Sequence, residues 1–175
     1  MNIAYIGVGS NIDPENNILK ALLILKQTVS VKSISNFYRT RPLFDPDQND
    51  YYNGVWEIMV NDPPADLKFN ILKGIEKKIG RVKKQNKNAP RVIDLDLLLY
   101  GDRVMKENNL VLPDPDIYKR AFIAVPLFEL APELVLPDTG KPLSFIVKHM
   151  DLAPLRRDVR FTRLLRKRLN DPQNT

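Results

Sequence analysis

The spacing of apolar residues divides the first hundred positions of the chain into six elements. Short runs rich in Val, Ile, Tyr and Leu that end at Gly, Pro, Asn or Asp are typical of strands, whereas apolar residues three and four apart are typical of helices. Asp13 and Pro14 suit the start of a helix, and Gly80 suits the end of another. The pattern predicts strands over residues 3–8, 31–39, 51–60 and 92–100, and helices over residues 14–28 and 64–80.

The order of these elements, β-α-β-β-α-β, is typical of a ferredoxin-like α+β sandwich. A chain of 175 residues is long enough for one well-formed core and short for two. We therefore expect one domain over residues 1–150. Extra short elements should follow the βαββαβ core: strands over residues 110–112 and 134–136, a helix over 118–130 that Pro126 kinks or splits, and a helix over 143–150.

The composition changes at Asp151. Seven Arg and Lys residues alternate there with Leu and Val in helical spacing, which predicts a basic amphipathic helix. We expect residues 151–175 to form a basic C-terminal extension that is not an independent domain, with a frayed end from Asp171. The helix either docks its Leu face on the core, the commoner arrangement, or contacts nucleic acid or acidic lipid with its Arg face.

The charge balance suits an anionic ligand. Lys and Arg outnumber Asp and Glu by 27 to 21, which gives a net charge of +6 and suits a nucleotide, a nucleic acid or a membrane surface without choosing among them. The chain has no cysteine and a single histidine, so thiolate and histidine-rich metal sites are excluded. No signal peptide or membrane span is expected. We expect a cytoplasmic monomer that contacts no membrane, and we expect no nucleic-acid partner, with the basic tail as the one reservation.

Two acids in the strand over residues 92–100 are the first candidates for chemistry. Because side chains alternate along a strand, Asp94 and Asp96 should share one face with Leu98 and Tyr100, about 6.5–7 Å apart at their Cα atoms. Two unit charges at that separation repel by roughly 2.5 kcal/mol at an effective dielectric constant near 20. Mg²⁺ takes such carboxylates together with substrate phosphates. The alternatives are solvated acids on an edge strand, or acids that are each paired with an arginine.

Cations precede this strand in a basic loop over residues 81–88, and Arg91 follows them. Carboxylates for a metal next to Arg and Lys for phosphates are the groups that a Mg²⁺–triphosphate requires. The Gly7-Val8-Gly9-Ser10 turn near the N-terminus is no phosphate loop, because Gly-Lys-Ser/Thr does not follow it. The sequence therefore indicates a magnesium–nucleotide site that is not built on a Walker motif.

Six motifs follow one another in a characteristic order. They are Tyr5-Ile-Gly-Val-Gly-Ser-Asn11, Phe37-Tyr-Arg-Thr40, Asp47-Gln48 with Tyr51-Tyr-Asn53, Ile75-Glu76 with Gly80-Arg81, Pro90-Arg-Val-Ile-Asp-Leu-Asp96, and Arg120-Ala-Phe122 with Pro126-Leu-Phe-Glu-Leu-Ala-Pro132. Together they resemble the 6-hydroxymethyl-7,8-dihydropterin pyrophosphokinases of folate biosynthesis. The resemblance covers roughly residues 3–137.

The resemblance implies an ATP-dependent diphosphotransferase. Enzymes of this family transfer the β,γ-diphosphate of ATP to the hydroxymethyl group of the pterin and release AMP. It implies two Mg²⁺ ions as cofactors, bound by Asp94 and Asp96, and ATP and the pterin as small-molecule partners. Arg81 and Arg91 match the phosphate-contacting arginines and complete the implied catalytic set.

The remaining site residues are also carried over from the resemblance. Tyr51 and Phe122 match two rings that sandwich the flat pterin, and Asn53 matches the amide that hydrogen-bonds its polar edge. Thr40 and Leu43 complete the implied substrate-binding set, and Glu76, Lys83, Arg91 and Arg120 form the implied nucleotide-binding set.

The chain departs from the pattern of the family in three places. Asp114 stands where His is usual, Asn88-Ala89 replaces Trp-Gly, and Arg41 precedes Pro42 where a small or apolar residue is commoner. Two alternatives therefore stay open: a paralogue that uses the same metal site on a modified pterin or another alcohol, and a non-enzymatic protein that uses its basic tail on nucleic acid or a partner.

Overall fold

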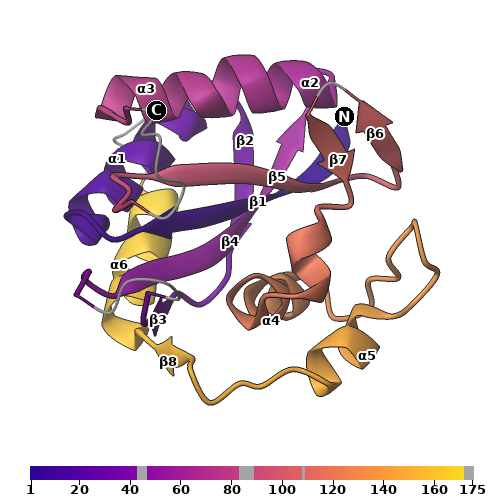
Figure 1. Ribbon diagram of the computed structural model, residues 1–175. Coiled ribbons are helices and arrows are strands. Elements are labelled where there is room, and N and C mark those ends of the chain that lie inside the picture. Colours follow the sequence, from indigo (N-terminus) through magenta and orange to yellow (C-terminus); the bar gives the residue numbers. More distant parts are fainter. Residues whose placement is uncertain (43–46, 83–88, 108, 172–175) are drawn as a thin grey trace.

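The structure is a computed structural model that describes residues 1–42, 47–82, 89–107 and 109–171. Its centre is an antiparallel sheet in which β1 (Asn2–Ser10) lies between β4 (Tyr51–Val60) and β5 (Asp94–Tyr100) (Figure 1). On the side away from β1, β4 pairs with two short strands, β2 (Ser30–Ile34) and β3 (Tyr38–Thr40). The strand β3 also pairs with β8 (Arg156–Arg157), which lies near the C-terminus.

The connections confirm the ferredoxin-like α+β fold. The strand order β5-β1-β4-β3 places β4 between β1 and the strands that follow α1, and places β1 between β4 and β5. Each helical crossover thus skips one strand, as a split βαβ unit does. The crossover helices are α1 (Pro14–Lys26) and a continuous helical segment made of α2 (Pro64–Asp66), the π-helical turn η1 (Leu67–Leu72) and α3 (Lys73–Ile79).

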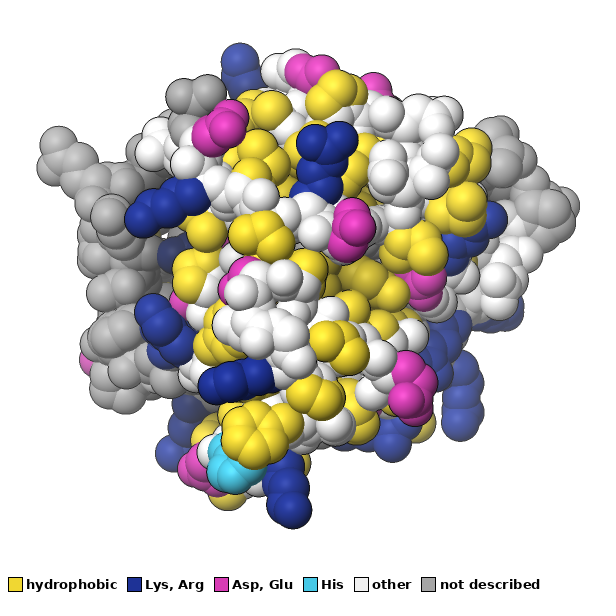
Figure 2. All heavy atoms as spheres, turned by 90° about the vertical axis from the view of Figure 1, so that its right-hand side faces the viewer, with side chains coloured by type: hydrophobic (Ala, Val, Ile, Leu, Met, Phe, Trp, Pro, Cys, Tyr) yellow, Lys and Arg dark blue, Asp and Glu magenta, His cyan; other side chains and the backbone are white. Residues whose placement is uncertain are grey.

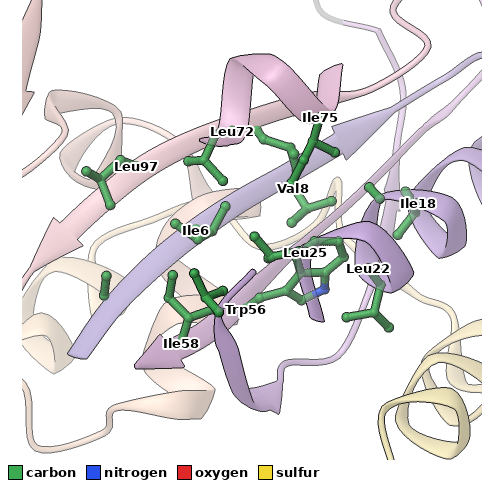
Figure 3. Close-up of a cluster of buried hydrophobic side chains, with 14 of the residues drawn as sticks. Ile6, Val8, Ile18, Leu22, Leu25, Trp56, Ile58, Leu72, Ile75 and Leu97 are labelled. Carbon is green, nitrogen blue, oxygen red and sulfur yellow. The ribbon is translucent and has the colours of Figure 1, made fainter. Parts of the chain in front are cut away.

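Helices cover both faces of the sheet. The crossover helices and α6 (Val159–Leu169) share one hydrophobic core with it, in which Trp56, Leu22 and Ile6 are fully buried (Figure 3). A second core lies on the opposite face, beneath α4 (Ala121–Leu130) and α5 (Leu143–Lys148). The other elements are the hairpin of β6 (Met105–Glu107) and β7 (Leu110–Leu112), and the 3-10 turn η2 (Pro115–Tyr118).

The prediction of one strand over residues 31–39 is wrong, because β2 and β3 are separated at residues 35–37. The Ser35 N–H still donates to the Val55 carbonyl of β4 at 3.0 Å, but the next two backbone donors bind side chains of distant elements. The Asn36 N–H donates to Glu129 Oε2 at 2.8 Å, and the Phe37 N–H donates to Thr162 Oγ1 at 2.8 Å. Glu129 lies in α4 and Thr162 in α6, so tertiary contacts interrupt the strand.

The strict alternation expected for residues 93–100 holds as far as Leu98, which lines the same pocket as Asp94 and Asp96, and breaks at Leu99. The register of β5 against β1 shifts between Tyr5 and Ile6, so one residue of β5 is left over. Leu98 and Leu99 consequently both pack under α4 and α5, and Tyr100 packs in the other core. A bulge of this kind reverses the facing of every later side chain.

Three smaller predictions also need correction. The helix expected over 118–130 begins at Ala121, after η2, and Pro126 lies inside it without splitting it. The strand expected over 134–136 is a single bridge between Val135 and Pro142. Asp13 adopts the left-handed conformation at φ 41°, and its carboxylate accepts Asn16 Nδ2 instead of a backbone N–H of the first turn. These segments therefore adopt turns or a left-handed residue where the sequence pattern predicted regular helix or strand.

The C-terminal helix docks on the core through its apolar face. Phe161 and Leu165 of α6 are fully buried, and the Phe161 ring lies edge-to-face on Phe37 at 5.4 Å. Asp158 accepts the Phe161 N–H at 2.9 Å and binds Arg39 at 2.6 Å. The buried face of α6 is therefore part of the main hydrophobic core.

The outer surface beside β6, β7 and α5 is chemically mixed. Figure 2 shows hydrophobic, basic and acidic side chains interspersed on this side of the molecule. Exposed apolar residues of these elements and their connections include Val104, Val135 and Phe145. None of the helices in the described ranges has the length and apolar content needed to cross a membrane.

Candidate active site

The floor of the candidate site is a row of residues across three paired strands. Gly9 of β1 pairs with Asn53 of β4 on one side and with Asp94 of β5 on the other. Gly9 has no side chain to fill the space between them, and an added Cβ would lie 3.2 Å from Asn53 Oδ1. A pocket of about 260 Å³ opens over this row. Its lining includes Thr40, Tyr51, Asn53, Arg91, Asp94, Asp96, Arg120 and Phe122 from the implied site, together with Arg41, Gln48 and Asp116.

Both acids of β5 line this pocket, but their surroundings differ. Asp94 is 13% exposed and bonds to Arg81 NH1 at 2.5 Å and to Arg91 NH1. Burial would raise the pKa of Asp94, but Arg81, Arg91 and then Lys73 outweigh it and hold the pKa below its usual value. Asp96 is 45% exposed, and partial desolvation within the pocket together with the negative charge of Asp94 raises its pKa. The two carboxylates therefore face one pocket with opposite pKa shifts.

Of the alternatives open at this strand, pairing with arginine holds for Asp94 and not for Asp96. The strand β5 does lie at the edge of the sheet, yet the Asp94 side chain is largely shielded from solvent. Asp96 bonds to no arginine among the ion pairs of the described residues. Its open carboxylate beside the pocket is a suitable hard oxygen ligand for Mg²⁺.

Glu76 lies behind the acidic pair rather than on the pocket wall. It is 4% exposed and accepts the Leu95 N–H at 2.7 Å, Lys73 Nζ at 2.7 Å and Arg81 NH1 at 2.6 Å. Burial raises its pKa despite these cations. In this structure Glu76 fixes the positions of Lys73 and Arg81, which in turn contact the acids of β5.

Lys73 is the residue of this cluster that the sequence did not single out. Its ammonium group contacts Asp96 at 3.5 Å and Asp94 at 3.8 Å. Asp96 and Glu76 raise its pKa although burial opposes them, so the group is a cation. The one signal in the sequence is the spacing of Lys73 and Glu76, three apart on a helix, which is common on ordinary helix surfaces.

Arg91 is held in place by the turn after β1. Its backbone N–H donates to Asn11 Oδ1 at 2.7 Å, and its carbonyl accepts the Asn11 N–H at 3.1 Å. Asn11 Nδ2 also donates to Gln48 Oε1 at 3.1 Å. Asn11 therefore connects the segment of Arg91 to Gln48, which also lines the pocket.

The other end of the pocket combines aromatic rings with buried polar groups. Asn53 Nδ2 donates to Thr40 Oγ1 at 2.9 Å, and both residues are buried. Tyr51 and Phe122 line the same pocket and are half-buried, and burial raises the pKa of Tyr51. This end is suited to a flat ring with hydrogen-bonding groups along its edge.

Asp114, one of the departures, caps a short helix in the structure. Its carboxylate accepts the Asp116 N–H at 2.9 Å at the start of η2. Burial raises its pKa. Of the other sequence candidates, Arg120 lies at the start of α4 and lines the pocket, whereas Leu43 and Lys83 lie outside the described residues.

The donor set is compatible with magnesium held jointly by protein and phosphate. The described residues contain no cluster of three or more acidic, His or Cys side chains that could enclose a metal alone. Mg²⁺ is commonly bound by one or two carboxylates plus substrate phosphates and water. Asp94 and Asp96 meet this requirement, with Arg91 and Arg120 on the pocket wall for phosphate oxygens.

The fold and the pocket together define a ferredoxin-like α+β protein with a candidate nucleotide-and-metal site. The chain belongs to the 7,8-dihydro-6-hydroxymethylpterin-pyrophosphokinase (HPPK) family, whose model matches residues 5–132. Members of this family are pyrophosphokinases that act in folate biosynthesis. The family, enzyme class and function expected from the sequence motifs are confirmed.

Named relatives agree with this assignment. The chain is 38% identical over 151 residues to the 2-amino-4-hydroxy-6-hydroxymethyldihydropteridine pyrophosphokinase of Synechocystis. This match covers 85% of this chain and 76% of the relative. The chain is 38% identical over 142 residues to the protein of the same name from Haemophilus influenzae, covering 79% and 88%. It is 35% identical to the Folic acid synthesis protein fol1 of Pneumocystis carinii, covering 84% of this chain and 20% of that much longer protein.

A solved structure supports the fold. The wild-type HPPK-DHPS of Plasmodium falciparum, crystallised with pteroate, has a TM-score of 0.66 and 14% sequence identity to this chain. The match covers 84% of this chain and 42% of that protein, so this chain spans less than half of its length.

Proposed function

We propose that this chain transfers the β,γ-diphosphate of ATP to the hydroxymethyl oxygen of 6-hydroxymethyl-7,8-dihydropterin and releases AMP. The observation that carries the proposal is the row Asn53–Gly9–Asp94. It places a buried amide and an acidic pair at opposite ends of one pocket.

We assign the ring-binding end of the pocket to the pterin. Asn53 supplies both a donor and an acceptor for the polar edge of the ring, and its bond to Thr40 fixes its orientation. Tyr51 and Phe122 supply aromatic surface on the pocket wall, and Leu43 belongs to the same proposed set. These groups would hold the ring so that its hydroxymethyl arm points toward β5.

We assign the acidic end to two Mg²⁺ ions and the phosphates of ATP. Bound there, Mg²⁺ supplies phosphate charge neutralisation and a lower pKa for the attacking hydroxyl. Asp94 and Asp96 would provide the protein oxygens, and Asp96 is the more accessible of the two. Arg91 and Arg120 would bind phosphate oxygens from the pocket wall, with Arg81 and Lys83 as further proposed phosphate contacts.

The chain's own residues mainly hold reactants in position. Asn11 fixes the backbone of Arg91. Glu76 fixes the side chains of Lys73 and Arg81. Such positioning converts the reaction of two bound substrates into an effectively unimolecular step. We further propose that the enzyme acts as a cytoplasmic monomer.

Product analysis tests this proposal directly. The protein is incubated with ATP, Mg²⁺ and 6-hydroxymethyl-7,8-dihydropterin, and nucleotides are separated by chromatography. We expect AMP to form only when the pterin is present, and ADP formation instead would contradict diphosphate transfer.

A pair of variants tests the location of the site. Asp96→Asn should lower the rate of AMP formation by at least a hundredfold, because it removes one proposed metal ligand. Asp102→Asn, an equal change of charge at an exposed position just after β5, should retain the wild-type rate. Equal rates in the two variants would place the metal elsewhere.

A further inference from the structure

The ammonium group of Lys73 lies among the acids of the proposed metal site. Its Nζ is 2.7 Å from Glu76 Oε1, 3.5 Å from Asp96 Oδ1 and 3.8 Å from Asp94 Oδ1, and it donates to the Leu95 carbonyl at 3.2 Å. The side chain is 33% exposed, so solvent screens it only partly. Lys73 begins α3, and Glu76 one turn later anchors it.

The two arginines of the cluster do not share this role. Arg81 binds Asp94 and Glu76, and Arg91 binds Asp94. Among the ion pairs of the described residues, Asp96 is paired with Lys73. Lys73 is thus the cation that compensates the more open of the two acids.

The cluster is electrically balanced without a metal. Three carboxylates, those of Glu76, Asp94 and Asp96, face three cations, those of Lys73, Arg81 and Arg91. A divalent cation that enters alone leaves the cluster with excess positive charge and must compete with the ammonium group for Asp96. A cation that enters with the phosphates of ATP brings its own compensating negative charge.

We propose that Lys73 is a built-in counter-ion that makes divalent cation binding at Asp94 and Asp96 depend on bound nucleotide. The inference rests on the proposed function, because it assigns the metal to these two acids. It adds that free Mg²⁺ binds this site weakly and that Lys73 is the cause. Lys73 is therefore a regulating residue of the metal site, in addition to any contact that it makes with phosphate.

Binding of Mn²⁺ as a probe, in the absence of nucleotide, tests the proposal. Titration of the full chain with Mn²⁺, followed by the electron paramagnetic resonance of the free ion, gives its dissociation constant. We expect Lys73→Gln to bind Mn²⁺ at least tenfold more tightly than the wild type, a difference of about 1.4 kcal/mol. An unchanged or weaker affinity would overturn the counter-ion role.

Matched variants separate this effect from a general change of charge or fold. Lys77→Gln removes the same charge from an exposed position on the same helix and should leave Mn²⁺ affinity as in the wild type. Lys73→Arg keeps the charge and should stay within threefold of the wild type. Circular dichroism and thermal melting check that each variant is folded, and Lys73→Met provides a second neutral side chain if Lys73→Gln is not.

The same titration with ATP present distinguishes failure of this inference from failure of the proposed function. Wild-type protein that binds Mn²⁺ with ATP, while Asp96→Asn does not, supports the metal site. If Lys73→Gln then matches the wild type without ATP, only the role of Lys73 is refuted. If ATP brings no Mn²⁺ to the wild-type protein, both proposals fail.

Discussion

Gly54 provides space for one aromatic ring. It lies in β4 next to Asn53, and a Cβ added there would lie 2.5 Å from Cε2 of Phe37. Phe37 is fully buried against Phe161, and its backbone N–H is bound by Thr162. The ring therefore has little freedom to move aside.

Gly54→Ala should lower the free energy of unfolding by about 1–3 kcal/mol, because overpacking a buried ring forces local rearrangement. Urea denaturation followed by circular dichroism measures the change. Gly74→Ala is the matched control: an added Cβ at Gly74 meets nothing within 4 Å, and the substitution removes a helix-interior glycine. It should stabilise the protein by roughly 0.5–1 kcal/mol. Equal losses in both variants would rule out the contact with Phe37.

At the scale of elements, α6 is joined to the sheet by its first residues. Asp158 caps the helix through the Phe161 N–H, and its carboxylate binds Arg39 of β3. The Asp158 N–H also donates to the Phe37 carbonyl at 2.8 Å. These contacts support our proposal that the C-terminal residues belong to the same folded unit as residues 1–150.

Asp158→Asn should destabilise the protein by about 1–2 kcal/mol at pH 7, since it removes charge from the bonds to Arg39 and the Phe161 N–H. Although burial opposes the effect, these bonds hold the pKa of Asp158 below its usual value. The stabilisation is therefore complete above the unfolded-state pKa, near 3.9, and is lost as the pH falls through the lower folded-state pKa. Urea denaturation of both proteins from pH 7 to pH 2.5 measures this convergence, and a pH-independent difference would contradict it.

The apolar face of α6 yields a second prediction. Phe161→Ala removes a fully buried ring and should cost about 3–5 kcal/mol of folding free energy. Val159→Ala, at a position that is 53% exposed in the same helix, should stay within about 0.5 kcal/mol of the wild type. Equilibrium denaturation compares the two, and a neutral Phe161→Ala would indicate that α6 detaches from the core in solution.

The sequence predicted whether a segment is a helix or a strand wherever the apolar spacing was regular, as in the crossover helices and in β4. The prediction failed where distant residues determine the backbone conformation, as where Glu129 and Thr162 bind N–H groups between β2 and β3. The bulge at Leu98 likewise depends on the pairing of β5 with β1, which no local pattern encodes. The acidic pair was found because carboxylates are rare in apolar strands. Lys73 was missed because nothing local distinguishes it from other helix-surface lysines.

At the scale of the whole molecule, ligand binding and folding are coupled through the sheet. The proposed site takes residues from β1, β3, β4, β5 and α4, so a bound ligand contacts elements from most of the chain. Any ligand that binds only the folded protein shifts the unfolding equilibrium toward the folded state.

Mg²⁺ and ATP together should therefore raise the free energy of unfolding by about 2.7 kcal/mol at a hundredfold excess over the dissociation constant. Differential scanning calorimetry follows the shift, and chelation of Mg²⁺ with EDTA should reverse most of it. Asp96→Asn should show little stabilisation under the same conditions, whereas Asp102→Asn should show the full effect. Stabilisation that survives both EDTA and Asp96→Asn would mean that ATP binds without the proposed metal site.

Under the proposed function, the row Asn53–Gly9–Asp94 would also limit the size of the substrate. Its two ends are separated by two interstrand spacings, about 10 Å, which ladder hydrogen bonds hold constant. No hinge lies between them along the row, so the distance cannot adapt to a longer or shorter molecule. Under the proposed reaction, an alcohol carried on a longer alkyl arm would extend beyond the reacting phosphorus even if its ring were bound normally. The enzyme would therefore discriminate among alcohols by arm length, through the geometry of its sheet.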